Sequence, residues 1–144
     1  MTGPAAAIDY EAAARPTLPE LLELFDAVGW TTYTKEPEAL AAAVRGSSTV
    51  VAARSGGLLV GLARVISDGA TICYLQDVLV HPGFQRLGVG RELVVRVLAP
   101  YAKVRQKVLL TDGEPGQRAF YQWLGYQETV DFHGGAVRAF VRFD

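Results

Sequence analysis

The sequence predicts a single α/β domain spanning residues 1–144, in which a mixed, mostly antiparallel central sheet is flanked by helices. Two observations support this fold class. Apolar runs of strand length alternate with segments whose apolar residues recur at helical spacing. One long apolar run, residues 71–80, is followed by a glycine-rich turn and a helical pattern, which indicates a strand–helix–strand crossover. The predicted order is β-α-α-β-β-β-α-β-α-β-β.

The first part of the chain is expected to supply one short strand and two helices. The strand is predicted at residues 6–12. The first helix begins after Thr17, a good N-cap, and ends at Gly29. An aromatic loop separates it from a second helix at residues 36–45.

Three strands follow, and the third leads into the crossover. Residues 49–54 and 58–67 are separated by Ser-Gly-Gly, a hairpin signal. Residues 71–80 are almost continuously apolar, which predicts burial on both faces. The remaining elements are a helix with apolar Val89, Leu93, Val94, Val97 and Leu98 that ends near Pro100, a strand at 107–111, a short helix between Pro115 and Gly125, and an antiparallel strand pair at 126–132 and 136–143.

The turn between the apolar strand and the next helix has the composition of an anion site. Backbone N–H groups at a helix N-terminus bind anions together with the helix dipole. Gly88 and Gly90 let the backbone approach a phosphate, and Arg86 and Arg91 add positive charge. The sequence therefore predicts a pyrophosphate site here.

Three glycine-rich signatures compete at this turn. A P-loop needs Lys-Ser/Thr after its last glycine, where this chain has Val89-Gly90. A dinucleotide fingerprint needs a third glycine where this chain has Leu93. The pattern Gln/Arg-x-x-Gly-x-Gly/Ala is matched by Gln85, Gly88 and Gly90. Taken alone, this pattern also fits a strand–helix turn that binds nothing.

That pattern resembles the coenzyme A loop of the GCN5-related N-acetyltransferase (GNAT) superfamily. Residues 119–126, Ala-Phe-Tyr-Gln-Trp-Leu-Gly-Tyr, resemble the Ala-Phe-Tyr-x-x-Leu-Gly-Phe segment of the same superfamily. The two motifs follow the family's order, and the agreement covers most of the chain. The resemblance implies transfer of an acetyl group from acetyl-CoA to an amine, with coenzyme A as the cofactor and no metal.

The resemblance also assigns cofactor-binding residues. The backbone of the turn is expected to hold the cofactor through Gln85, Arg86, Leu87, Gly88, Val89, Gly90 and Arg91. The strand residues Val78, Leu79 and Val80 are expected to pair with the pantetheine arm, in a gap between this strand and the strand around Leu109. A backbone N–H, expected to be that of Leu79, faces the thioester carbonyl.

Tyr121 is the predicted general acid, because it matches the family's tyrosine beside the coenzyme A sulfur. A phenol with a pKa of about 10 is protonated at neutral pH and can donate to a departing thiolate. The sequence departs from the family at Glu114, where many relatives have an asparagine that helps hold coenzyme A. That contact is not expected here.

The general base is not assigned. Some relatives, including spermidine/spermine acetyltransferases, have a glutamate where this chain has Gln76, and an amide cannot accept a proton. Asp77 is adjacent, but successive strand residues face opposite sides unless a bulge intervenes. Gln76 and Asp77 are therefore interpreted as acceptor-binding groups. For Asp77, a buried hydrogen-bond anchor is an equal alternative, and a water relay can serve as the base.

Acceptor recognition is expected from two loops. Trp30 and Tyr33 follow the first helix and can stack on an aromatic or cationic acceptor, although Trp30 also suits a hydrophobic lid. His133 lies in the predicted loop between the last two strands.

Composition narrows the function classes. The net charge of −1 gives no basis for nucleic acid as a partner, and no apolar run is long enough to span a membrane. The N-terminus lacks the positive start of a signal peptide, so a cytoplasmic protein is expected. The lone Cys73 lies mid-strand, which argues against an acyl-enzyme.

The sequence thus favours an acetyl-CoA-dependent N-acetyltransferase that acts on the primary amine of a small molecule, by direct attack in a ternary complex. Two alternatives stay open: transfer to a protein N-terminus or lysine, and a non-catalytic acyl-CoA-binding sensor. A homodimer in which the last strands pair across subunits is compatible with the sequence.

Overall fold

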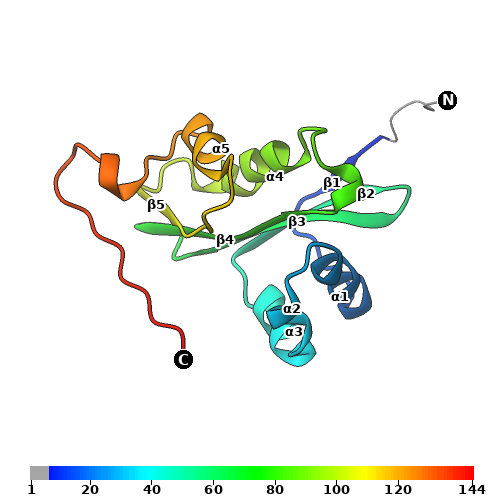
Figure 1. Ribbon diagram of the computed structural model, residues 1–144. Helices are drawn as coiled ribbons and strands as arrows, with labels where there is room; N and C mark the ends of the chain where they lie inside the picture. Colours follow the sequence, from blue (N-terminus) through cyan, green and yellow to red (C-terminus); the bar gives the residue numbers. More distant parts are fainter. Residues whose placement is uncertain (1–6) are drawn as a thin grey trace. The chain divides into compact units, whose positions relative to one another are not determined.

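The computed structural model describes residues 7–144, which divide into two compact units (Figure 1). The first unit ends at Leu110 and the second begins at Thr111. The first contains the whole sheet and four helices, and the second contains one helix and a long irregular segment.

The first unit is built on a five-stranded sheet whose strands lie side by side in chain order. The strands are β1 (Asp9–Glu11), β2 (Thr49–Ser55), β3 (Leu58–Ser67), β4 (Ile72–Val80) and β5 (Gln106–Leu109). Neighbours from β1 to β4 are antiparallel, and β5 is parallel to β4. The prediction of a mixed, mostly antiparallel sheet is confirmed.

Helices cover both faces of this sheet (Figure 1). On one face lie α1 (Leu18–Ala27), α2 (Thr31–Thr34) and α3 (Pro37–Arg45), and on the other lies α4 (Val89–Leu98). Short 3₁₀ turns, η1 (Pro82–Phe84) and η2 (Ala99–Tyr101), flank α4. The second unit contains α5 (Gln117–Trp123) and a third 3₁₀ turn, η3 (Thr129–Asp131).

The start of α1 is fixed by a capping box. The Thr17 N–H donates to Glu20 Oε1 at 2.9 Å, and the Glu20 N–H donates to Thr17 Oγ1 at 3.4 Å. Glu20 also accepts hydrogen bonds from Arg54 of β2, which lower the pKa of its carboxyl to about 2. Arg54 binds Glu11 of β1 as well, so one guanidinium ties α1 to two strands.

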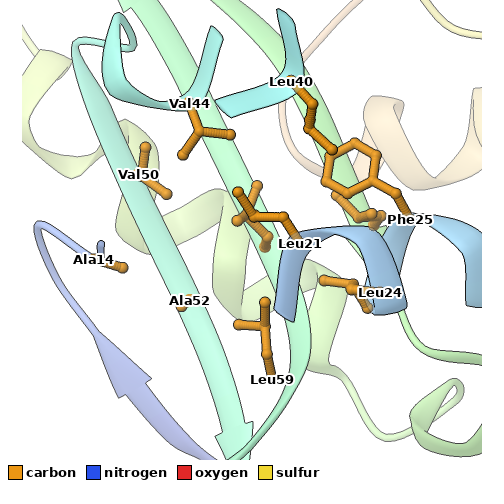
Figure 2. Packing of buried hydrophobic residues seen from close by; sticks show 11 residues of the cluster. Ala14, Leu21, Leu24, Phe25, Leu40, Val44, Val50, Ala52 and Leu59 are labelled. Carbon is orange, nitrogen blue, oxygen red and sulfur yellow. The ribbon is translucent and has the colours of Figure 1, made fainter. Parts of the chain in front are cut away.

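The core between α1, α3 and the sheet is a single apolar cluster (Figure 2). Its members project from facing elements and are almost fully buried: Ala14, Leu21, Leu24, Phe25, Leu40, Val44, Val50, Ala52, Leu59, Leu62 and Leu79. The helical spacing of the α1 and α3 members and the alternation along β2 place them on the same face.

On the opposite face, α4 buries the residues that the sequence predicted, including Leu93 and Val97. This helix approaches β3 closely because β3 has a glycine at the contact. A Cβ at Gly61 would lie 3.0 Å from Leu93 Cδ1 and 3.3 Å from the carbonyl oxygen of Leu79. The absence of a side chain at Gly61 therefore sets the distance between helix and sheet.

Three expectations differ from the structure. Along β4 the burial alternates between buried and half-buried residues, so burial on both faces is wrong. The aromatic loop after α1 contains the helical turn α2. The final strand pair is absent from the described residues: η3 lies within 126–132, and residues 133–144 form no helix or strand. Strand propensity produces a strand only where a neighbouring edge can pair with it.

The predicted first strand is also shorter, since it is confined to Asp9–Glu11, and residue 6 lies outside the described part of the chain. The other elements agree with the prediction to within a few residues at their ends.

We expect Gly61→Ala to lower the free energy of unfolding by about 1–3 kcal/mol, because the added methyl group overpacks the α4 contact. Urea denaturation measures this change. Gly113→Ala is the matched control, because a Cβ at Gly113 would meet no atom within 4 Å. Equal stability of the two variants would show that α4 can move away from β3 without loss.

Candidate functional site

Strands β4 and β5 pair over only part of their length. Residues 72–75 of β4 pair with residues 106–109 of β5, and β4 continues through residues 76–80 without a strand on that side in the described chain. On its other side, β4 stays paired with β3 as far as Val80. The backbone of residues 76–80 therefore forms an open edge inside the first unit, where the sequence predicted a gap.

The direction of each N–H group along this edge follows from two hydrogen bonds. The His81 N–H donates to the Val60 carbonyl of β3 at 2.7 Å. The Val80 carbonyl accepts from Gln85 Nε2 at 3.1 Å, on the opposite side. Because successive residues of a strand point their N–H groups to alternate sides, those of Val78 and Val80 face the open edge.

This alternation corrects one expectation. The N–H of Leu79 points towards β3, as does that of His81, so it is not available to a thioester carbonyl at the open edge. Strand register decides the direction of an N–H group, and the sequence alone does not determine the register.

The glycine turn lies directly after β4. The Gln85 side chain donates to the carbonyl of Val80, the last residue of the strand. This hydrogen bond positions the turn, so it is not a donor left free for a ligand. Gly88 is the N-cap of α4 with φ of +78°, and a Cβ there would point into open space. Arg86 also has a left-handed backbone, with φ of +66°. Such a conformation costs a non-glycine residue about 1–2 kcal/mol, and strained residues of this kind cluster at active sites and ligand clamps.

The turn offers a donor set that suits a pyrophosphate. No described side chain caps the N-terminus of α4. The first N–H groups of a helix have no intrahelical acceptor, and the helix dipole adds partial positive charge. Leu87 and Gly88 are exposed, so a ligand can approach their backbone. The residues present therefore fit the diphosphate of coenzyme A.

A bulge in β4 brings Gln76 and Asp77 to one face of the sheet. Arg64 of β3 is opposite Asp77, whereas the next residue, Val65, is opposite Leu75, so Gln76 is the extra residue. Both side chains reach the same hydroxyl group. The Tyr33 hydroxyl donates to Asp77 Oδ1 at 2.9 Å and accepts from Gln76 Nε2 at 3.3 Å.

The buried carboxylate of Asp77 holds this hydroxyl in place through a hydrogen bond. Its side chain is 3% exposed and is paired with the buried guanidinium of Arg64. Arg64 also donates to Ser47 Oγ, which follows α3, at 3.3 Å. Burial, and then the charge of Asp77, raise the pKa of the Tyr33 hydroxyl above its usual value. The geometry matches the anchor interpretation of Asp77, one of the two that the sequence left open.

Trp30 and Tyr33 form a stacked pair, with ring centroids 6.2 Å apart and planes inclined by 28°. Both rings pack edge-on against Phe25, which is fully buried. Trp30 is thus half-buried over α1, as expected of a lid, while the Tyr33 hydroxyl remains tied to Gln76 and Asp77.

The second unit holds the other two predicted residues. Tyr121 lies on α5, half-buried, with its ring edge-on to Phe120 at 4.9 Å and to Tyr126 at 6.1 Å. Burial, and then the charge of Asp112, raise the pKa of Tyr121, so its hydroxyl is protonated at neutral pH. His133 is exposed in the irregular segment.

The structure brings Tyr33, Gln76 and Asp77 together, and it places residues 85–91 directly after the open edge. Sequence reasoning did not single out Arg64. The signal available was one arginine within an otherwise apolar strand. In residues 7–144 no helix is long and apolar enough to cross a membrane, and no group of three His, Cys, Asp or Glu side chains could hold a metal ion.

Comparison with known proteins agrees with this architecture. Residues 18–134 match the family described as the acetyltransferase (GNAT) domain. The uncharacterized N-acetyltransferase ycf52 of Pyropia yezoensis is 30% identical over 78% of this chain and 66% of its own length. The chloroplastic serotonin N-acetyltransferase 2 of Oryza sativa subsp. japonica is 32% identical over 77% of this chain and 56% of its own. The chain thus spans two thirds or less of these relatives.

Among solved structures, the GNAT family protein SP0256 of Streptococcus pneumoniae has a TM-score of 0.78 at 26% identity. The match covers 95% of this chain and 100% of that protein. The fold class predicted from the sequence is confirmed by this similarity.

We expect Asp77→Asn to lower the free energy of unfolding by about 3–5 kcal/mol, because it leaves the Arg64 guanidinium buried without a counter-charge. Urea denaturation measures the loss, with Asp26→Asn on the exposed face of α1 as control. The double variant Arg64→Met/Asp77→Leu should recover most of it, since neither charge remains. A double variant as unstable as Asp77→Asn would show that the unpaired charge is not the cause.

Proposed function

This chain belongs to the GNAT family of acetyltransferases, and from that premise we propose that it transfers an acetyl group from acetyl-CoA to the primary amine of a small molecule. The observation that carries the proposal is the open edge of β4, which runs directly into the glycine turn at the start of α4. An extended ligand that ends in a diphosphate fits these two features together.

The chain's own residues provide the binding. The N–H groups of Val78 and Val80 face the open edge, where they can donate to the amide or acyl oxygens of a ligand that lies along the strand. The backbone of residues 86–90 takes the diphosphate. Acetyl-CoA supplies an acyl group activated as a thioester, so no acyl-enzyme is needed and attack is direct, in a ternary complex.

The acceptor must lose a proton before it attacks, because an alkyl ammonium has a pKa of about 10. The Tyr33 O–H already donates to Asp77 and its oxygen accepts from Gln76, which leaves one oxygen lone pair for an N–H of the amine substrate. Tyr33 and Gln76 therefore orient the amine, and a water molecule carries its proton away. Tyr121 holds a proton on its hydroxyl oxygen for the departing sulfur.

The choice of a small amine rests on two observations. The rice relative is named for serotonin, which is a small primary amine. The stacked rings of Trp30 and Tyr33 lie beside the polar groups of Gln76 and the Tyr33 hydroxyl, which suits an acceptor with an apolar body and an amine head.

We expect the purified protein to bind acetyl-CoA and CoA saturably, but not NADH, in a calorimetric titration. Gly88→Val should weaken acetyl-CoA binding at least tenfold, about 1.4 kcal/mol, because the side chain would occupy the space of the diphosphate. Gly69→Val is the matched control, because Gly69 has a similar φ of +76° in a turn at the start of β4 and also has open space around it. Retained affinity in Gly88→Val would exclude the turn as the cofactor site.

We expect Tyr121→Phe to lower kcat by about 10²–10⁴-fold while leaving acetyl-CoA affinity unchanged, because the variant loses the proton donor but keeps the ring. Because burial, and then the charge of Asp112, raise the pKa of Tyr121, its hydroxyl keeps its proton at neutral and mildly alkaline pH, and wild-type kcat should not decrease in that range through this group. Steady-state kinetics on an amine panel measures both effects, with Tyr10→Phe as control. Unchanged kcat across the pH range would remove Tyr121 as the acid.

A further inference from the structure

A chain of three hydrogen bonds leads from a buried charge to the half-buried residues beside α2. Its members are Arg64, Asp77, Tyr33 and Gln76. Arg64 Nε donates to Asp77 Oδ2, and the Tyr33 hydroxyl donates to Asp77 Oδ1 at 2.9 Å. Gln76 Nε2 then donates to the Tyr33 oxygen at 3.3 Å. Arg64 and Asp77 are almost fully buried, whereas Tyr33 and Gln76 are half-buried and reach solvent.

The direction of each bond in this chain follows from its first member. A guanidinium has only donors, and a carboxylate has only acceptors. The Tyr33 hydroxyl therefore has to donate to Asp77, which leaves its oxygen as an acceptor. Only the NH₂ group of the Gln76 amide can meet that oxygen, so the amide oxygen, Oε1, takes the other position. No described residue donates to Oε1, so this acceptor is left for a ligand.

The guanidinium that begins the chain is held in place by α3. Arg64 Nη1 donates to Ser47 Oγ at 3.3 Å and to the Ala43 carbonyl oxygen at 3.5 Å. Ser47 Oγ donates to the same carbonyl oxygen at 2.8 Å. Arg64 cannot turn away from Asp77 without losing these bonds as well. The direction of the chain is therefore set by the fold before any substrate binds.

We propose that Arg64 is a positioning residue that fixes the polarity of the amine site, so that Tyr33 and Gln76 offer only hydrogen-bond acceptors to the substrate nitrogen. This inference rests on the proposed function. A neutral primary amine has two N–H groups and one lone pair. The Tyr33 oxygen and Gln76 Oε1 accept one N–H each, and the nitrogen lone pair stays available for the acyl carbon.

This polarity selects primary amines over secondary amines. A neutral secondary amine has a single N–H, so it leaves one of the two acceptors without a partner, and an unpaired polar group is costly where water is excluded. The reversed chain would have the opposite effect. It would present the Gln76 NH₂ group, which would bind the nitrogen lone pair that has to attack.

NMR of the free protein tests the polarity without any substrate. In the wild-type chain we expect one Gln76 side-chain N–H proton to exchange with water at least tenfold more slowly than those of the exposed Gln127, because the Tyr33 oxygen holds it. The Gln76 signal is assigned by its absence from Gln76→Met.

The variants of this experiment separate polarity from stability. Arg64→Met/Asp77→Leu leaves no buried charge, but it frees the Tyr33 hydroxyl to donate to Gln76 Oε1, so the slow exchange should be lost. Arg64→Lys should keep the slow exchange, because an ammonium also has only donors. Slow exchange that persists in the double variant would show that Arg64 does not set the polarity.

Steady-state kinetics tests the selection of the substrate. We compare kcat/KM for a primary amine of the panel with that for its N-methyl derivative. The ratio should fall about tenfold in Arg64→Met/Asp77→Leu, mainly through KM for the amine, and should be retained in Arg64→Lys. Calorimetric affinity for acetyl-CoA should be the same in all three proteins.

Two outcomes would count against different parts of the argument. An unchanged ratio in the double variant would refute selection by polarity. A wild-type chain that acetylates no amine would refute the proposed function and the selection with it, whereas the exchange rate of Gln76 would still decide whether Arg64 fixes the direction of the chain.

Discussion

The structure depends on unequal pairing along β4. This strand is hydrogen-bonded to β3 along its whole length but to β5 only at residues 72–75. Backbone polar groups rarely stay without partners, so an open edge inside a sheet is a binding surface for an extended molecule. The crossover from β4 to β5 passes through the glycine turn and α4, and this topology brings the proposed anion site to the end of the same open edge. In the proposed function, recognition of the cofactor therefore relies on main-chain groups.

The same strand positions the proposed acceptor-binding residues through its bulge. Gln76 is the extra residue of the bulge, and its side chain lies on the same face as that of Asp77. The buried pair of Arg64 and Asp77 then holds the Tyr33 hydroxyl in place through its hydrogen bond to Asp77. A buried ion pair contributes little net stability but strongly restricts which arrangements are allowed, because separating the charges is costly. Three elements, β3, β4 and the turn α2, are held in a single relative position by this contact, so the hydroxyl is preorganised before any substrate arrives.

The sequence was sufficient to predict features that depend on residues close to one another in the chain. Thr17 and Gly29 delimit α1, Val89 and Leu93 mark the buried face of α4, and Gln85, Gly88 and Gly90 locate the turn. Features that depend on pairing between strands could not be predicted from the sequence. The extra residue Gln76 and the N–H direction of Leu79 are properties of the register between two strands. The contact between Arg64 and Asp77 joins different strands, and the segment 136–144 has strand propensity but pairs with no strand among the described residues.

The left-handed backbone of Arg86 has a consequence for how such a chain changes under selection. Glycine adopts that conformation without strain. Selection for heat resistance alone would therefore allow Arg86→Gly, which relieves the backbone strain. The same replacement removes a positive charge from the turn that is proposed to bind the diphosphate. Backbone strain and affinity for a charged cofactor would therefore respond in opposite directions to this one substitution, so selection for stability alone and selection for the proposed cofactor binding would favour different residues at position 86.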